Sequence, residues 1–158
     1  MVRKASNPES YDDALALALK ILTRAAQTKA KLKEKLERRQ FEATIIERVL
    51  KKLEDAELIN DQKYAQDYIS YRSRTSPLGS RYLKFKLLQK GIPKDIATVT
   101  TAEITSEQEL ELARAAAAKR LSTLGRYPAE ERKVKLARFL AARGFSSQAV
   151  YTLIKEMQ

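Results

Sequence analysis

One apolar pattern occurs three times along this chain, and it limits the folds that the chain can adopt. Each copy has two leucines four residues apart, a turn residue, an apolar residue and then a second apolar stripe, and the copies start about fifty residues apart. A helix-forming unit that recurs at this period cannot bury its apolar face without a neighbouring copy. The members are Leu32, Leu36, Phe41, Ile45 and Val49; Leu83, Leu87, Ile92, Ile96 and Thr100; and Leu136, Leu140, Phe145, Ala149 and Leu153.

The first stripe of each copy ends at Gln40, Gly91 or Gly144, and an apolar residue follows at once. Glycine just past the last helical turn adopts the left-handed conformation without strain, and the apolar residue after it folds back onto that turn. We therefore predict a helix end at each of the three positions. Gln40 has a Cβ, and a residue with a Cβ disfavours this left-handed conformation.

Helix start signals divide the chain further: Ser76 before Pro77, Pro93, Pro128, Ser146, and a predicted capping box from Ser106 to Glu109. No segment alternates with period two over the length of a strand. The sequence therefore predicts an all-α fold of three tandem three-helix repeats in an elongated, curved array. The expected helices are 11–26, 29–39, 43–57, 61–74, 78–90, 93–102, 107–123, 129–143 and 147–156. The expected divisions are a flexible N-terminus at 1–10 and repeats at 11–58, 59–104 and 105–158.

The composition lacks most of the side chains that enzymes commonly use for catalysis. The chain has no cysteine and no histidine, so it lacks thiolates, the common transition-metal ligands and the commonest general acid-base residue. Acidic residues cluster near Asp12, Glu54 and Glu107, but helix starts explain most of them better than a metal site does. We predict no enzyme activity, no metal and no cofactor. The longest apolar run, 14–19, is too short for a signal or a membrane span, so we expect a cytoplasmic protein.

Positive charge is unevenly distributed along the chain, with a net charge of +5 in residues 61–92 and of +7 in residues 114–158. The net charge is +11, and the stretch from Arg72 to Lys90 contains six bases and no acid, interleaved with Tyr71, Tyr82 and Phe85. Such a stretch suits a polyanionic partner. Any single base is more simply explained as part of a solvated helix face, and the aromatic residues are equally consistent with a core.

Three motifs follow one another along the chain. The first runs from Lys31 through Phe41 to Tyr64, with a Leu-Ile-Asn-Asp link at 58–61. The second combines Arg-Ser-Arg at 72–74 with Lys-Gly-Ile at 90–92, and the third is the stretch 135–145, which ends in Arg-Gly-Phe. Together they cover nearly all of residues 11–157, and in this order they resemble the RecX family, bacterial regulators of the RecA recombinase. Lys86 and Phe85 depart from the family, which usually has an acidic residue and a basic or glutamine residue at these positions.

The resemblance implies a protein without an active site that binds in the groove of the RecA filament on single-stranded DNA. Such proteins restrain filament growth, ATP hydrolysis, strand exchange and cleavage of the SOS repressor, and so act in homologous recombination and DNA repair. We expect a monomer with weak, non-specific nucleic-acid binding and no membrane contact. The residues predicted to contact RecA or DNA are Arg72, Arg74, Arg81, Lys84, Lys90, Arg138 and Arg143.

Two other functions are consistent with the residues alone. An independent basic DNA-binding protein would gain its affinity mainly from counterion release. A helical-repeat scaffold would instead hold some other acidic protein. Binding to DNA alone, and retention by RecA filaments, distinguish these alternatives from the first.

Overall fold

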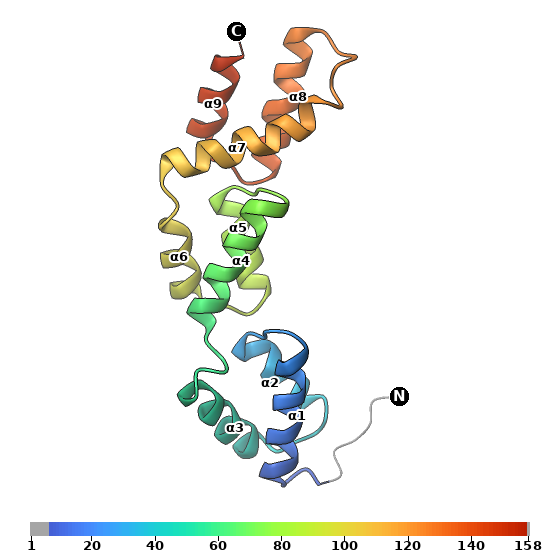
Figure 1. Cartoon of the computed structure of the whole chain (residues 1–158), viewed down its shortest axis with the longest axis vertical. Coiled ribbons are helices and arrows are strands. Elements are labelled where there is room, and N and C mark those ends of the chain that lie inside the picture. The colour runs from blue at the N-terminus through green and yellow to red at the C-terminus, as the bar shows by residue number, and fades with distance from the viewer. Residues whose placement is uncertain (1–6, 158) are drawn as a thin grey trace. The chain divides into compact units, whose positions relative to one another are not determined.

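The computed structural model describes residues 7–157, which form nine α-helices and no strand (Figure 1). The predicted all-α class is confirmed, and every predicted helix is present with ends within two residues of those expected. The flexible N-terminus predicted for residues 1–10 lies mostly outside the described residues. The helices are α1 Tyr11–Arg24, α2 Lys29–Glu37, α3 Ala43–Asp55, α4 Asp61–Thr75, α5 Ser80–Gln89, α6 Lys94–Ala102, α7 Ser106–Leu121, α8 Ala129–Ala142 and α9 Ser147–Glu156.

The chain divides into two compact units, and the boundary between them falls within the middle set of three helices. The first unit contains the residues up to Tyr64 and the segment Gln89–Pro93, and the second contains Ala65–Leu88 and the residues from Lys94 onward. Each unit has one cluster of buried apolar side chains, formed by the first and the last helix trios respectively. The repeat boundaries predicted after residues 58 and 104 remain predictions.

In the first unit, α1, α2 and α3 contact one another pairwise. The apolar stripe of α3 supplies the largest share of the core: Ile45, Ile46, Val49, Leu50 and Leu53 are all buried. Recurrence at three- and four-residue intervals places these side chains on one helix face, which is why the sequence pattern predicted this helix. The leucine pair of the predicted repeat, Leu32 and Leu36, is fully buried against them.

Side-chain caps fix several helix starts. The hydroxyls of Ser10, Thr28 and Ser146 each accept a hydrogen bond from a backbone N–H in the first turn that follows. The predicted capping box is displaced by one residue: Thr105 and Gln108 form it in place of Ser106 and Glu109, because Thr105 is the residue with extended backbone. The Glu109 carboxylate is buried and instead accepts from the N–H and the hydroxyl of Ser80, at 3.2 and 2.9 Å.

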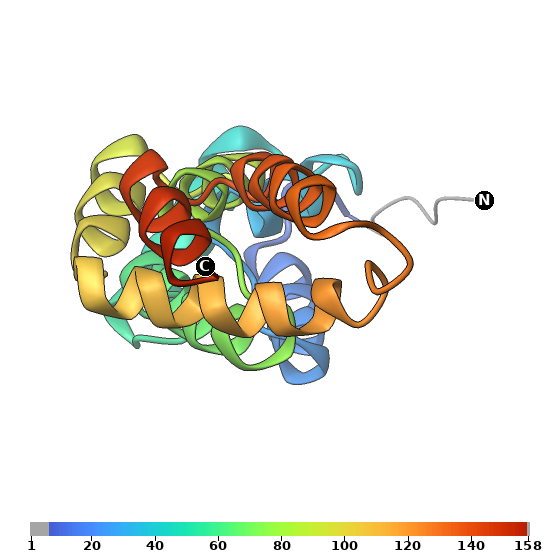
Figure 2. The ribbon, with the colours of Figure 1, turned by 90° about the horizontal axis from the view of Figure 1, so that it is seen from above.

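In the second unit, α7 lies across α8 and α9, and the three helices contact one another pairwise (Figures 1 and 2). Ala113, Ala116 and Ala117 bring α7 close to its neighbours, and Leu136 and Leu140 of α8 are fully buried. Small side chains on α7 allow this close approach because they leave the backbone near the partner helix. The long helix thereby positions its last turn beside the end of α8.

The turn after α8 packs directly against the start of α5. Gly144 has a φ of +81°, and the Gly79 N–H donates to the Arg143 carbonyl at 2.9 Å. A Cβ on Gly144 would lie 2.4 Å from the Tyr82 backbone nitrogen, and a Cβ on Gly79 would lie 2.1 Å from the Phe145 nitrogen. Two glycines are therefore needed for two backbone segments to touch.

An equivalent contact occurs in the first unit. Gly91, also at a φ of +81°, follows Lys90, whose carbonyl accepts from the Thr28 hydroxyl at 2.6 Å. A Cβ on Gly91 would meet the Ala30 Cβ at 2.6 Å. The third turn residue, Gln40, has a φ of 64° as the sequence predicted, and it is exposed to solvent.

Gly144→Ala should lower the free energy of unfolding by about 2 to 4 kcal/mol, because the new Cβ meets backbone atoms of α5 and the residue keeps a positive φ. Urea denaturation followed by circular dichroism measures the change. Gly125→Ala is the matched control, since nothing lies within 4 Å of the Cβ it would carry. A loss for Gly144→Ala no larger than that of the control would contradict the close contact.

Gln40→Gly should raise the free energy of unfolding by up to about 1 kcal/mol, because glycine relieves the strain of a positive φ and no side-chain packing is lost at this exposed position. Thermal unfolding of the two proteins tests this. Arg39→Gly provides the comparison at a negative φ and should be destabilising. Destabilisation by Gln40→Gly would show that the side chain matters more than the backbone conformation.

Candidate functional site

The structure distributes the seven predicted contact residues over both units and over different degrees of burial. Lys90 belongs to the first unit, and the other six belong to the second. Arg74, Arg81 and Arg138 are exposed, whereas Arg72, Lys84, Lys90 and Arg143 are half-buried. Whether the seven residues share one binding surface remains a prediction.

Arg72 and Arg143 are brought together although they are far apart in sequence. Arg143 follows the last residue of α8, and its guanidinium donates to the Pro77 carbonyl at 3.1 Å and to the Ser76 hydroxyl at 2.7 Å. Burial lowers the pKa of Arg143, and the nearby charge of Arg72 lowers it further. The Arg72 Nε is buried and has no hydrogen-bond partner within the described part of the chain.

Two further cations, which the sequence analysis did not select, belong with this pair. Lys119 and Arg120 close α7, where basic residues commonly complement the helix dipole, so nothing local distinguishes them. In the structure, the Lys119 ammonium donates to the Thr75 carbonyl at 3.1 Å. The guanidiniums of Arg120 and Arg143 both lie over the Phe139 ring, at 5.5 and 5.4 Å from its centroid. We call Arg72, Lys119, Arg120 and Arg143 the basic cluster.

A second basic surface runs along the outer face of α5. Arg81, Phe85 and Leu88 are exposed on this face, while Leu83 and Leu87 are buried on the opposite one. Spacings of three and four residues place the exposed side chains next to one another. The sequence left open whether Phe85 belongs to a core, and its 49% exposure settles that it does not. We call Arg81, Lys84, Phe85 and Leu88 the α5 face.

The aromatic rings of α5 are held by their neighbours. Tyr82 and Phe85 lie 5.8 Å apart between ring centroids, and the Lys86 ammonium lies 5.2 Å from the Tyr82 centroid and 6.0 Å from that of Phe85. A cation over an aromatic face is attracted by the ring quadrupole. Lys86 and the two aromatic rings therefore form one local arrangement.

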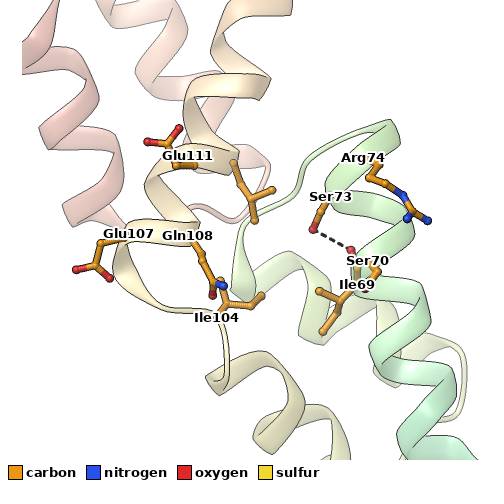
Figure 3. A pocket seen from close by; sticks show the side chains of 9 residues that line it. Ile69, Ser70, Ser73, Arg74, Ile104, Glu107, Gln108 and Glu111 are labelled. Atoms are coloured by element: carbon orange, nitrogen blue, oxygen red, sulfur yellow. Dashed lines mark hydrogen bonds between the residues drawn. The ribbon is translucent and has the colours of Figure 1, made fainter.

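A cavity of about 620 Å³ lies between α4 and α7 (Figure 3). Ile69, Ile104 and Leu112 give it apolar walls, and Glu107 and Glu111 belong to its lining on the α7 side. Figure 3 shows Arg74 directed away from α7. The two carboxylates and the one guanidinium of the lining give no excess of positive charge, so this cavity does not extend the basic cluster.

The described residues contain no group of three or more side chains suited to hold a metal ion. Within residues 7–157, no helix combines the length and the apolar character that crossing a bilayer requires. The perturbed pKa of Arg143 arises from burial and from a like charge, and its neighbours Ser76 and Phe139 form no arrangement for nucleophilic or acid-base catalysis. The four cations of the basic cluster suit an anionic ligand.

Comparison with known families accounts for nearly the whole chain. Three family models match in order: the first three-helix domain of RecX at residues 14–53, the second at 60–98 and the third at 107–154. These matches coincide with the three trios of helices in the structure. The predicted tandem three-helix repeats are thus confirmed.

Individual relatives agree with the family models. The chain is 34% identical to a Chlorobium limicola protein named regulatory protein RecX, over 93% of this chain and 88% of the relative. It is 32% identical to one of the same name from Amycolatopsis mediterranei, over 94% and 85% of the two chains. The crystal structure of RecX from Lactobacillus salivarius superposes with a TM-score of 0.85 at 26% identity, covering 93% of this chain and 96% of that one.

Proposed function

This chain belongs to the RecX family of regulatory proteins, and we propose that it modulates the RecA recombinase. In this proposal it binds in the groove of the RecA filament on single-stranded DNA and restrains filament growth. ATP hydrolysis, strand exchange and cleavage of the SOS repressor by the filament fall as a consequence. The protein acts through binding energy alone and is not an enzyme.

The α5 face is the observation that carries this proposal. Phe85 and Leu88 are exposed apolar side chains, 49% and 41% accessible, and the cations Arg81 and Lys84 lie on the same face. Exposed aromatic and arginine side chains supply most of the energy of protein interfaces when a partner covers them. Cations around them favour a partner with acidic groups and speed the encounter with it.

The basic cluster supports a second contact, with the DNA of the filament. Its four cations lie in the second unit together with the α5 face, so that one compact unit carries both an apolar-cationic surface and a cationic one. An alternative function, as an independent DNA-binding protein, draws on the basic cluster without the α5 face. Retention by RecA filaments, compared with retention by the same DNA without RecA, separates the two functions.

Arg74→Glu combined with Arg81→Glu should weaken retention on RecA filaments about tenfold, because two attractive charges become repulsive. Both side chains are exposed, so the fold should be unaffected. Arg72 is left unchanged because it is half-buried. Co-sedimentation with filaments assembled on single-stranded DNA measures the retained fraction.

The matched control is Lys20→Glu combined with Arg24→Glu, which makes the same change of charge on exposed positions of α1. This control should lose less than threefold, the small effect of long-range charge alone. Equal losses in both variants would show that net charge, and not this part of the second unit, determines binding. Failure of the unaltered protein to co-sediment at all would contradict the proposed function itself.

A further inference from the structure

A small cavity opens beside the basic cluster, at the place where three segments meet. It has a volume of about 270 Å³ and is bounded by the end of α7, the end of α8 and the link between α4 and α5. All three segments belong to the second unit. The lining residues with polar or aromatic groups are Ser76, Lys119, Arg120, Thr123, Phe139 and Arg143.

The positive charge that lines the cavity is not neutralised by acidic side chains in the lining. Lys119, Arg120 and Arg143 line it, and no carboxylate does. None of these three forms an ion pair within the described part of the chain, whereas most of the ion pairs that are present join residues a turn apart on one helix. The buried carboxylate of α7, that of Glu109, accepts hydrogen bonds from Ser80. Cations gathered with no acid among them repel one another and attract an anion.

The cations are held in place before any ligand arrives. Arg143 donates to Pro77 and Ser76, Lys119 donates to Thr75, and the Phe139 ring lies under the guanidiniums of Arg120 and Arg143. Groups that are already fixed lose little conformational entropy on binding. The arrangement therefore favours a ligand over a set of mobile surface lysines with the same charge.

Hydrogen-bond donors remain available in the cavity. A guanidinium has five N–H donors, and the two hydrogen bonds of Arg143 to the protein use only part of that number. The Nε of Arg120 is buried and has no acceptor among residues 7–157. The Ser76 hydroxyl accepts from Arg143 and keeps its own hydrogen to donate. A buried donor without an acceptor is costly, and an anionic oxygen would relieve that cost.

The donors approach from three separate segments, which suits a tetrahedral group better than a planar carboxylate. Phosphate contacts in protein–DNA complexes come typically from arginine, lysine and serine or threonine hydroxyls, the residue types that line this cavity. Phe139 is covered by guanidiniums, so its ring is not free to stack on a base. Recognition would involve the sugar–phosphate backbone and would be independent of base sequence.

We propose that this cavity binds one internal phosphodiester group of single-stranded DNA, held by Lys119, Arg120 and Arg143. The inference deepens the proposed function, because it assigns the DNA contact of a filament-bound regulator to one pocket. It does not require RecA, so its test is made with DNA alone.

The test measures the affinity of the protein for fluorescent (dT)20 without RecA, by anisotropy over a series of NaCl concentrations. The pocket variant combines Lys119→Gln with Arg120→Gln, and the control combines Lys20→Gln with Arg24→Gln, two exposed positions on α1. We expect a five- to tenfold loss of affinity for the pocket variant and less than twofold for the control. A plot of log K against log salt has a negative slope. Its magnitude should be smaller by about 0.7 in the pocket variant, the value for one single-strand phosphate.

Three single variants keep the result interpretable if the double variant is unstable. Lys119→Gln alone, at an exposed position, should lose two- to threefold, and Arg120→Lys should lose less than Arg120→Gln because it keeps the charge. Equal losses for pocket and control variants would overturn the assignment, since the cations would then act only through net charge. Dependence of binding on a 5′-phosphate on the oligonucleotide would overturn it as well, because the ligand would be a terminal monoester.

Loss of RecA filament retention with unchanged affinity for (dT)20 would also contradict the inference, because the pocket would then hold a carboxylate of the protein partner. That outcome leaves the proposed regulation of RecA intact. Conversely, the predicted loss of DNA affinity in a protein that RecA filaments do not retain would support the pocket and contradict the proposed function.

Discussion

The backbone contact between the turn after α8 and the start of α5 determines how the second unit is built. Gly79 and Gly144 approach so closely that neither tolerates a side chain, and the Gly79 N–H donates to the Arg143 carbonyl. This contact fixes the main chain of Arg143, so its guanidinium reaches Pro77 and Ser76. The close packing of the two glycines thereby places Arg143 near the end of α7. The basic cluster therefore forms from residues that are distant in sequence.

The first unit uses the same type of contact with different groups. There the carbonyl before the turn glycine accepts from the Thr28 hydroxyl instead of from a backbone N–H, and Ala30 takes the position that requires a small side chain. Gln40, at the third equivalent turn, is exposed, so only the backbone conformation is constrained at that position. Glycine recurs in the repeat where a turn touches another segment, and this explains its absence at Gln40.

The sequence predicted the helices well because their signals are local. Leucine spacing, turn glycines and hydroxyl caps each act within a few residues. The capping box was misplaced by one residue where Thr105 and Ser106 offer the same group side by side, and the start predicted at Ser76 and Pro77 precedes α5, which begins at Ser80. The basic cluster could not be predicted in full. Lys119 and Arg120 look like ordinary helix-end cations, and the proximity of Arg72 to Arg143 depends on the packing of residues far apart in the sequence.

In the proposed function, the α5 face contacts protein and the basic cluster contacts the DNA backbone. Hydrolysis of ATP by RecA on single-stranded DNA, with this protein titrated in, is the most direct test of this function. If the protein restrains the filament as proposed, the rate of hydrolysis falls with increasing protein at a fixed concentration of RecA. A rate that stays constant up to a several-fold excess of this protein over RecA would contradict it.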